Sequence, residues 1–125
     1  MAAIAKPLTL MVNQRLVYEY DRNQRLPGKQ REFLDVMDQD MAAGIEIDDI
    51  FYPQPEQQQR ISYVAANLAH AYHAKNEALM KATSAWLALR SPDLIQLIVE
   101  ENGEEFSLQL KFAKEEEIVD DSSTA

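Results

Sequence analysis

The chain has 125 residues, of which 46% are hydrophobic, and a formal net charge of −9. This size and apolar content predict one globular domain, and the absence of cysteine excludes disulfides, thiolate zinc sites and cysteine nucleophiles. The negative charge argues against nucleic acid and anionic membranes as partners, because both would repel it. No apolar run is long enough for a signal peptide or a membrane span, so we expect a cytoplasmic protein.

The first predicted element is a strand within residues 8–20, LTLMVNQRLVYEY. Apolar or aromatic side chains occupy alternate positions from Leu16 to Tyr20, which is the two-residue period of a strand over residues 15–20. Asn13-Gln14 is either a turn or a bulge. The segment is therefore either a hairpin or one longer strand.

The turn signal Pro27-Gly28 precedes a helix predicted from Lys29 to Ala43. Gly44 follows at the position where a left-handed residue usually ends a helix. The stripe expected to be buried consists of Phe33, Leu34, Met37 and Met41. The opposite, solvated face carries three acids at three-residue spacing, namely Glu32, Asp35 and Asp38.

Residues 44–55, GIEIDDIFYPQP, are predicted to be a connector. The apolar residues among them should lie across the edge of the core rather than in solvent. A short helical turn is expected to begin at Asp48.

The longest predicted helical stretch runs from Pro55, expected at the first helical position, to Arg90. Nine of the residues from Ala65 to Ala88 are alanine, the best helix former. Asn76 is able to cap a second helix, so the stretch is either one helix or two. The predicted core stripe contains Ile61, Val64, Ala65, Leu68, Tyr72, Leu79, Ala82, Trp86 and Leu89.

The C-terminal segment DLIQLIVEENGEEFSLQLKF predicts a hairpin with Asn102-Gly103 as its two-residue loop. That loop places Val99 opposite Phe106, with further apolar pairs along the same face. Residues 115–125 contain few apolar side chains and are expected to be a disordered acidic tail.

Together these elements predict a single α+β domain over residues 1–114. We expect two layers, with about three antiparallel strands formed by the N-terminal strand and the C-terminal hairpin. Two or three helices should cover one face of this sheet.

Catalytic and cofactor motifs are not found in the sequence. The three glycines do not form a phosphate-binding loop, and there is no Gly-x-Ser-x-Gly nucleophile elbow. We therefore expect no cofactor and a non-catalytic accessory or regulatory protein that acts through protein–protein contacts. A homodimer is also expected.

An alternative function is a small metal-binding protein or metal-dependent enzyme. On one continuous helix, His70, His73 and Glu77 fall within an arc of about 60°. Two imidazoles and a carboxylate so placed resemble the start of a zinc or non-haem iron site. The competing interpretation is that the histidines pack beside tyrosines and that Glu77 pairs with Lys81 on the helix surface.

Charge is distributed unevenly along the chain. Residues 32–59 contain eight acids and no base, and residues 92–125 also have a net charge of −8. Such acidic segments suit a protein partner with a basic surface, although acidic surfaces also serve solubility alone. The residues expected to contact this partner are Asp35, Asp38, Glu101 and Glu104.

Overall fold

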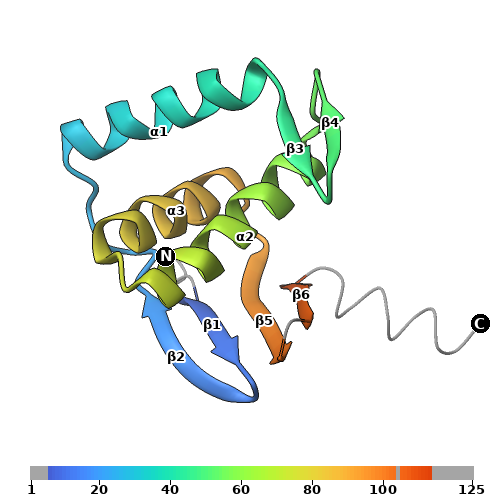
Figure 1. Ribbon diagram of the computed structural model, residues 1–125. Helices are drawn as coiled ribbons and strands as arrows, with labels where there is room; N and C mark the ends of the chain where they lie inside the picture. The colour runs from blue at the N-terminus through green and yellow to red at the C-terminus, as the bar shows by residue number, and fades with distance from the viewer. Residues whose placement is uncertain (1–5, 104, 114–125) are drawn as a thin grey trace, which may run out of the picture. The chain divides into compact units, whose positions relative to one another are not determined.

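The computed structural model describes residues 6–103 and 105–113. It is an α+β structure, as predicted, and its chain divides into two compact units, Met1–Asn23 with Ala88–Ala125 and Gln24–Leu87. The predicted tail, residues 115–125, lies outside the described residues. In chain order the elements are β1 (Leu8–Val12), β2 (Arg15–Tyr20), α1 (Gly28–Ala42), β3 (Ile45–Ile47), β4 (Ile50–Tyr52), α2 (Gln57–Ala74), α3 (Glu77–Arg90), β5 (Leu94–Asn102) and β6 (Glu105–Phe112) (Figure 1).

The first unit contains a four-stranded sheet in the order β2-β1-β5-β6. β1 and β2 form a hairpin whose turn residues, Asn13 and Gln14, have φ values of 50° and 69°. Two positive φ values are what a two-residue type I′ loop requires, and asparagine tolerates them better than most residues. The N-terminal segment is therefore a hairpin, which is one of the two structures that its sequence allowed.

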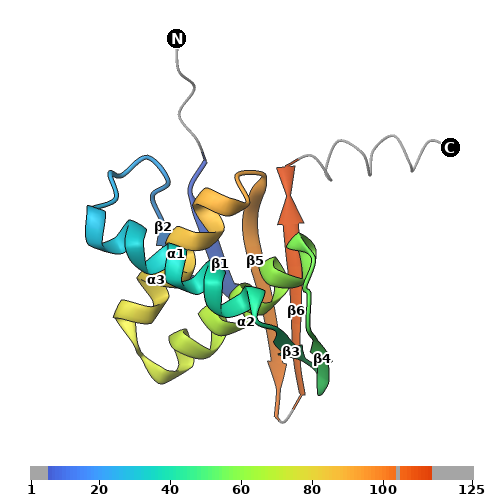
Figure 2. The ribbon, with the colours of Figure 1, turned by 90° about the horizontal axis from the view of Figure 1, so that it is seen from above.

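The centre of this sheet differs from the prediction, because β1 and β5 are parallel. The expected sheet had about three strands, all antiparallel, whereas the observed sheet has four and is mixed. Figure 2 shows β5 beside β6, as the hairpin requires. β1 buries alternate residues, as one buried sheet face demands, and β5 does so from Leu97 to Val99, after an irregularity between Leu94 and Gln96. The buried residues are Leu8, Leu10, Val12, Leu94, Leu97 and Val99.

The register of the C-terminal hairpin was predicted wrongly by two residues. Val99 lies opposite Leu108 rather than Phe106, and Asn102 pairs with Glu105 instead of belonging to the loop. Gly103, with φ of 65°, is in the turn. The predicted register would have set Glu101 against Glu104, a destabilising pair of like charges. In the observed register Glu101 lies opposite Phe106.

The second unit begins with α1, which was predicted to within one residue at each end. Leu34 and Met41 are buried, and Met37 is half-buried. Phe33, however, is 45% exposed, so its predicted place in the core was wrong. At 100° per residue Phe33 lies at the border of the buried stripe, where helical period alone does not decide exposure.

The predicted connector is in fact a small hairpin, β3–β4. Its turn residues Asp48 and Asp49 have φ values of 51° and 67°, so no helical turn begins at Asp48. Ile50 and Phe51 are 55% and 60% exposed, contrary to the expectation that they would be covered. The ring of Phe51 lies against Gly44, whose φ is +123°.

The long helical stretch is broken in two, as Asn76 had indicated. Lys75 adopts a left-handed conformation with φ of 57°. The N–H of Lys75 donates to the carbonyl of Tyr72, and the N–H of Asn76 donates to the carbonyl of Ala71. This pair of bonds is a Schellman motif with lysine in the place usually taken by glycine. Asn76 Oδ1 then accepts the N–H of Leu79, 3.1 Å away, and begins α3.

The start of α2 and the predicted core stripe need smaller corrections. α2 begins two residues after Pro55, with Glu56 as the N-cap in a reciprocal capping box with Gln59. Leu68 and Trp86 are both 1% exposed, which confirms them as core residues. Leu79 and Leu89 are 36% and 53% exposed and do not belong to the core.

Among the helices that the structure describes, none is long and apolar enough to cross a bilayer.

Candidate functional site

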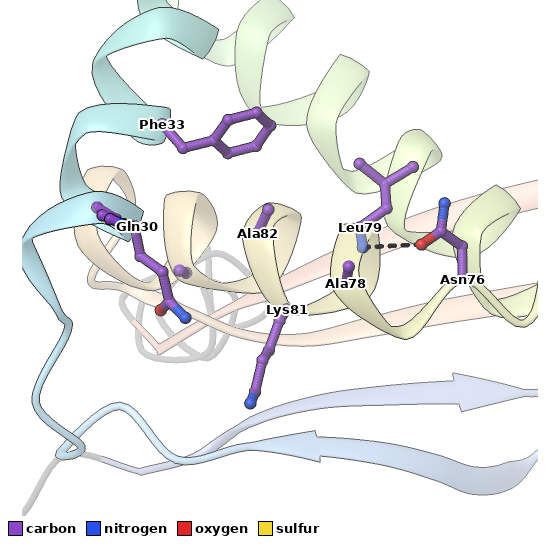
Figure 3. A pocket seen from close by; sticks show the side chains of 9 residues that line it. Gln30, Phe33, Asn76, Ala78, Leu79, Lys81 and Ala82 are labelled. Carbon is purple, nitrogen blue, oxygen red and sulfur yellow. Dashed lines mark hydrogen bonds between the residues drawn. The ribbon is translucent and has the colours of Figure 1, made fainter.

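A groove of about 460 Å³ lies between the first half of α1 and most of α3, within the second unit (Figure 3). Its volume is within the range of about 300–1,000 Å³ typical of binding sites, and its lining is mainly apolar. The residues that line it are Lys29, Gln30 and Phe33 from α1, and Asn76, Ala78, Leu79, Lys81, Ala82 and Ala85 from the start and body of α3.

The alanines of α3 explain why a groove forms here. Ala78, Ala82 and Ala85 follow one another at four- and three-residue spacing, so they lie on one helical face. Their methyl groups fill less of the space between α1 and α3 than larger side chains would. The face of α3 toward Phe33 is therefore left as a shallow trough.

A hydrogen bond ties α1 to α3 just beyond this trough. The indole Nε1 of Trp86 donates to Asp38 Oδ1 over 2.7 Å. Trp86 directly follows Ala85, and Asp38 lies further along α1 than Phe33, so this contact lies beyond the lining residues along both helices. The two helices are thus held at one end, and their earlier turns flank the groove.

The groove has an apolar side and a polar side. Figure 3 shows Phe33 reaching from α1 over Ala82 in the direction of Leu79, while Gln30 and Lys81 extend away on the other side. Phe33 and Leu79 remain 45% and 36% exposed. Large apolar side chains that face each other across a groove and remain exposed are a common feature of binding surfaces.

The electrostatic character of the groove is opposite to that of the whole protein. Lys29 and Lys81 are the charged residues among those that line it, and none of its described lining residues is acidic. α1 also has no acid in its first turn, and Pro27 provides no capping side chain. The positive end of the α1 dipole is therefore not offset by an acid of its own first turn.

The residues of the alternative metal site do not share one helix. His70 and His73 are on α2, and Glu77 is the first residue of α3, beyond the left-handed Lys75. The continuous helix that the prediction assumed is therefore wrong. All three side chains are exposed, and His73 makes an edge contact with the ring of Tyr72 at 5.5 Å. Within residues 6–103 and 105–113, no three His, Asp or Glu side chains are grouped closely enough to hold a metal ion.

The acids predicted to contact a partner occupy different environments. Asp35 is exposed on α1, whereas Asp38 is half-buried and accepts the Trp86 hydrogen bond. Glu101 is on β5 in the other unit, and its backbone N–H donates to Asn13 Oδ1 over 2.8 Å. Glu104 lies outside the described residues. Their role in binding stays a prediction.

A second hollow, of about 380 Å³, is found at the end of β5 in the first unit. Glu100 is exposed there and Glu101 is half-buried. The lining residues are Asn13, Glu100, Glu101, Asn102, Phe106 and Ser107, so this hollow is polar and acidic.

The half-buried cation Arg22 in the first unit has a structural role. Burial lowers the pKa of the Arg22 guanidinium, an effect that nearby Asp93 partly offsets. Its Nη2 donates to the carbonyls of Ser91, at 3.1 Å, and Leu94. Arg22 thus fastens the segment that follows β2 to the start of β5.

Sequence reasoning did not find the groove between α1 and α3. It assigned Phe33, Leu79 and Ala82 to the core because each falls on an apolar stripe. The available signal was the alanine spacing on α3 opposite a single large residue on α1, which leaves less side-chain volume than a packed helix pair needs. No protein family, curated protein or solved structure was found to match this chain.

Proposed function

We propose that this protein is a non-catalytic accessory or regulatory protein that acts by binding another protein. The observation that supports this most directly is the apolar groove between α1 and α3, in which Phe33 and Leu79 are exposed. Exposed aromatic side chains at a concave surface are favoured anchors in protein interfaces. A partner that covers them removes apolar area from water, which is the main driving force for association.

The test is site-specific photo-crosslinking in cells. A photoreactive phenylalanine analogue placed at Phe33 should form a discrete protein adduct, and Leu79→Asp in the same chain should abolish it. The matched control places the analogue at Gln39, an exposed α1 position that does not line the groove. Equal labelling from both positions, or an adduct unaffected by Leu79→Asp, would contradict binding through the groove. Circular dichroism should show that the proteins with the analogue at Phe33 or Gln39, and the Leu79→Asp variant, remain folded.

A second proposal is that the acidic surface binds a basic protein. The hollow lined by Glu100 and Glu101 supports it, since clustered carboxylates raise the local concentration of cationic partners. Such binding should weaken as salt rises, because the Debye length is about 8 Å at physiological ionic strength. Charge reversal at Asp35 and Glu101 should weaken it further without unfolding the protein.

We also propose a cytoplasmic location and a homodimer. The cysteine-free sequence is compatible with a reducing compartment. Light scattering coupled to gel filtration tests the dimer through its mass, and a monomer at micromolar concentration would contradict it. Fractionation of cells tests the location.

A further inference from the structure

We infer that the groove between α1 and α3 binds one amphipathic α-helix of a partner protein, and that this helix carries acidic residues on the side facing Gln30 and Lys81. This inference rests on the proposed function and adds the conformation and charge of the bound segment. Three features of the groove carry it, namely its shape, the backbone around it and its charge.

The shape suits a helix. Ala78 and Ala82 form a low floor on α3, and Phe33 rises from α1 on one side of it (Figure 3). Ala85 also lines the groove but is 3% exposed. Helices pack closest where one of them presents small residues, because the ridge of the other then enters the space they leave. An apolar stripe at positions i, i+4 and i+7 of the partner would contact this floor, with Phe33 and Leu79 beside it.

The backbone around the groove favours a helix over an extended peptide. Both walls are helices, so their interior N–H and C=O groups are already paired along the helix. Asn76 Oδ1, at the end of the groove, is also occupied by the N–H of Leu79. An extended peptide that binds by strand addition pairs its backbone with a free strand edge, which this groove does not offer. A helix pairs its own backbone and needs only side-chain contacts.

The charge selects acidic residues on that helix. Lys29 and Lys81 line the groove of a protein whose net charge is −9, and no described lining residue is acidic. The positive end of the α1 dipole adds to this local field. Carboxylates beside the apolar stripe would therefore be attracted, whereas lysines or arginines in the same positions would be repelled.

The experiment is selection from a displayed library of random peptides of roughly 15 residues, about four helical turns, against the folded full-length protein. We expect selected peptides to show apolar residues at helical spacing with Asp or Glu beside them. A synthetic copy should lose about tenfold in affinity for Lys81→Glu, and a proline in its centre should abolish binding. Fluorescence anisotropy measures both effects.

Two variants serve as controls. Arg15→Glu makes the same charge change at an exposed position of β2 that does not line the groove or belong to α1, and it should change peptide affinity less than twofold. Leu79→Asp alters an exposed wall residue of the groove and should abolish binding. For both variants, the urea concentration at the midpoint of unfolding should be close to that of the parent protein.

The outcomes separate this inference from the function on which it rests. Selected peptides that tolerate a central proline, carry basic residues, or bind Lys81→Glu as well as the parent would overturn the helix or its charge. If Phe33 still forms its cellular adduct in that case, protein binding through the groove stands. If acidic helices bind as expected but no cellular adduct forms, the proposed function is overturned.

Discussion

Replacing Asp38 by alanine tests whether this carboxylate fastens α1 to α3. Its Oδ1 accepts the indole N–H of Trp86 at 2.7 Å, and Trp86 is 1% exposed. The substitution leaves a buried N–H without its acceptor, which costs about 1–3 kcal/mol. Asp38 is only half-buried, so water has partial access to it. We therefore expect the free energy of unfolding to fall by about 1–2 kcal/mol, near the lower end of that range.

The assay is urea unfolding followed by circular dichroism, applied to a double-mutant cycle of Asp38→Ala and Trp86→Phe. If the hydrogen bond operates, the two losses should not add, and the coupling should be about 1 kcal/mol. Asp35→Ala is the matched control, since Asp35 is an exposed acid on the same helix. This substitution should lower the free energy of unfolding by no more than about 0.5 kcal/mol.

A coupling below about 0.3 kcal/mol, or equal losses for Asp38→Ala and Asp35→Ala, would refute the reasoning, because additive changes mean independent sites. The prediction also affects how binding is tested. Charge reversal at Asp38 should destabilise the second unit, so a loss of binding in that variant would not identify an interface. Asp35 is the informative position on α1.

Three further predictions concern stability. Lys75→Gly should raise the free energy of unfolding by about 1 kcal/mol, because glycine adopts φ of 57° without the strain of a β-carbon, and Lys75→Ala should give no comparable gain. Gly44→Ala should cost about 1–3 kcal/mol, because its φ is +123° and the new Cβ would lie 2.7 Å from Cε1 of Phe51. If that loss disappears in a Phe51→Ala background, the ring contact and not the backbone is its cause. Burial, with smaller contributions from Tyr18 and Asp21, raises the pKa of Tyr20 above its ordinary value of 10.0. The neutral phenol thus contributes stability that is complete below pH of about 10 and is lost as pH rises through the raised pKa. Tyr20→Phe should therefore lessen the fall in stability above that pH, and an unchanged alkaline profile in urea unfolding would contradict this.

The elements that the sequence determined depend on local rules. α1 was predicted to within one residue because a turn signal precedes it and a glycine follows it. Asn76 indicated the break before α3 because its side chain is able to accept the N–H three residues later. The buried places of Leu68 and Trp86 followed from the helical period. For the bounds of α1 and the break at Asn76, residues that are neighbours along the chain supply the controlling interaction.

The pairing of strands was decided by tertiary structure. Side chains alternate with a period of two, so a shift of two residues between β5 and β6 keeps every side chain on its face. The apolar pattern therefore excluded a slip of one residue but not the observed slip of two, which sets Glu101 opposite Phe106. The parallel contact of β1 with β5 joins segments distant in sequence, and no local pattern specifies it.

The candidate site also depended on the tertiary structure. Phe33 and Leu79 have the period of core residues, and whether such residues are covered depends on the size of the side chains facing them from another helix. Alanines on α3 leave that space open, so the two side chains line a groove. Asp38 likewise has the spacing of a solvated acid, and only the approach of Trp86 from α3 makes it a hydrogen-bond acceptor within the fold. A helical period states which residues share a face, while the neighbour that the face meets is a property of the folded chain.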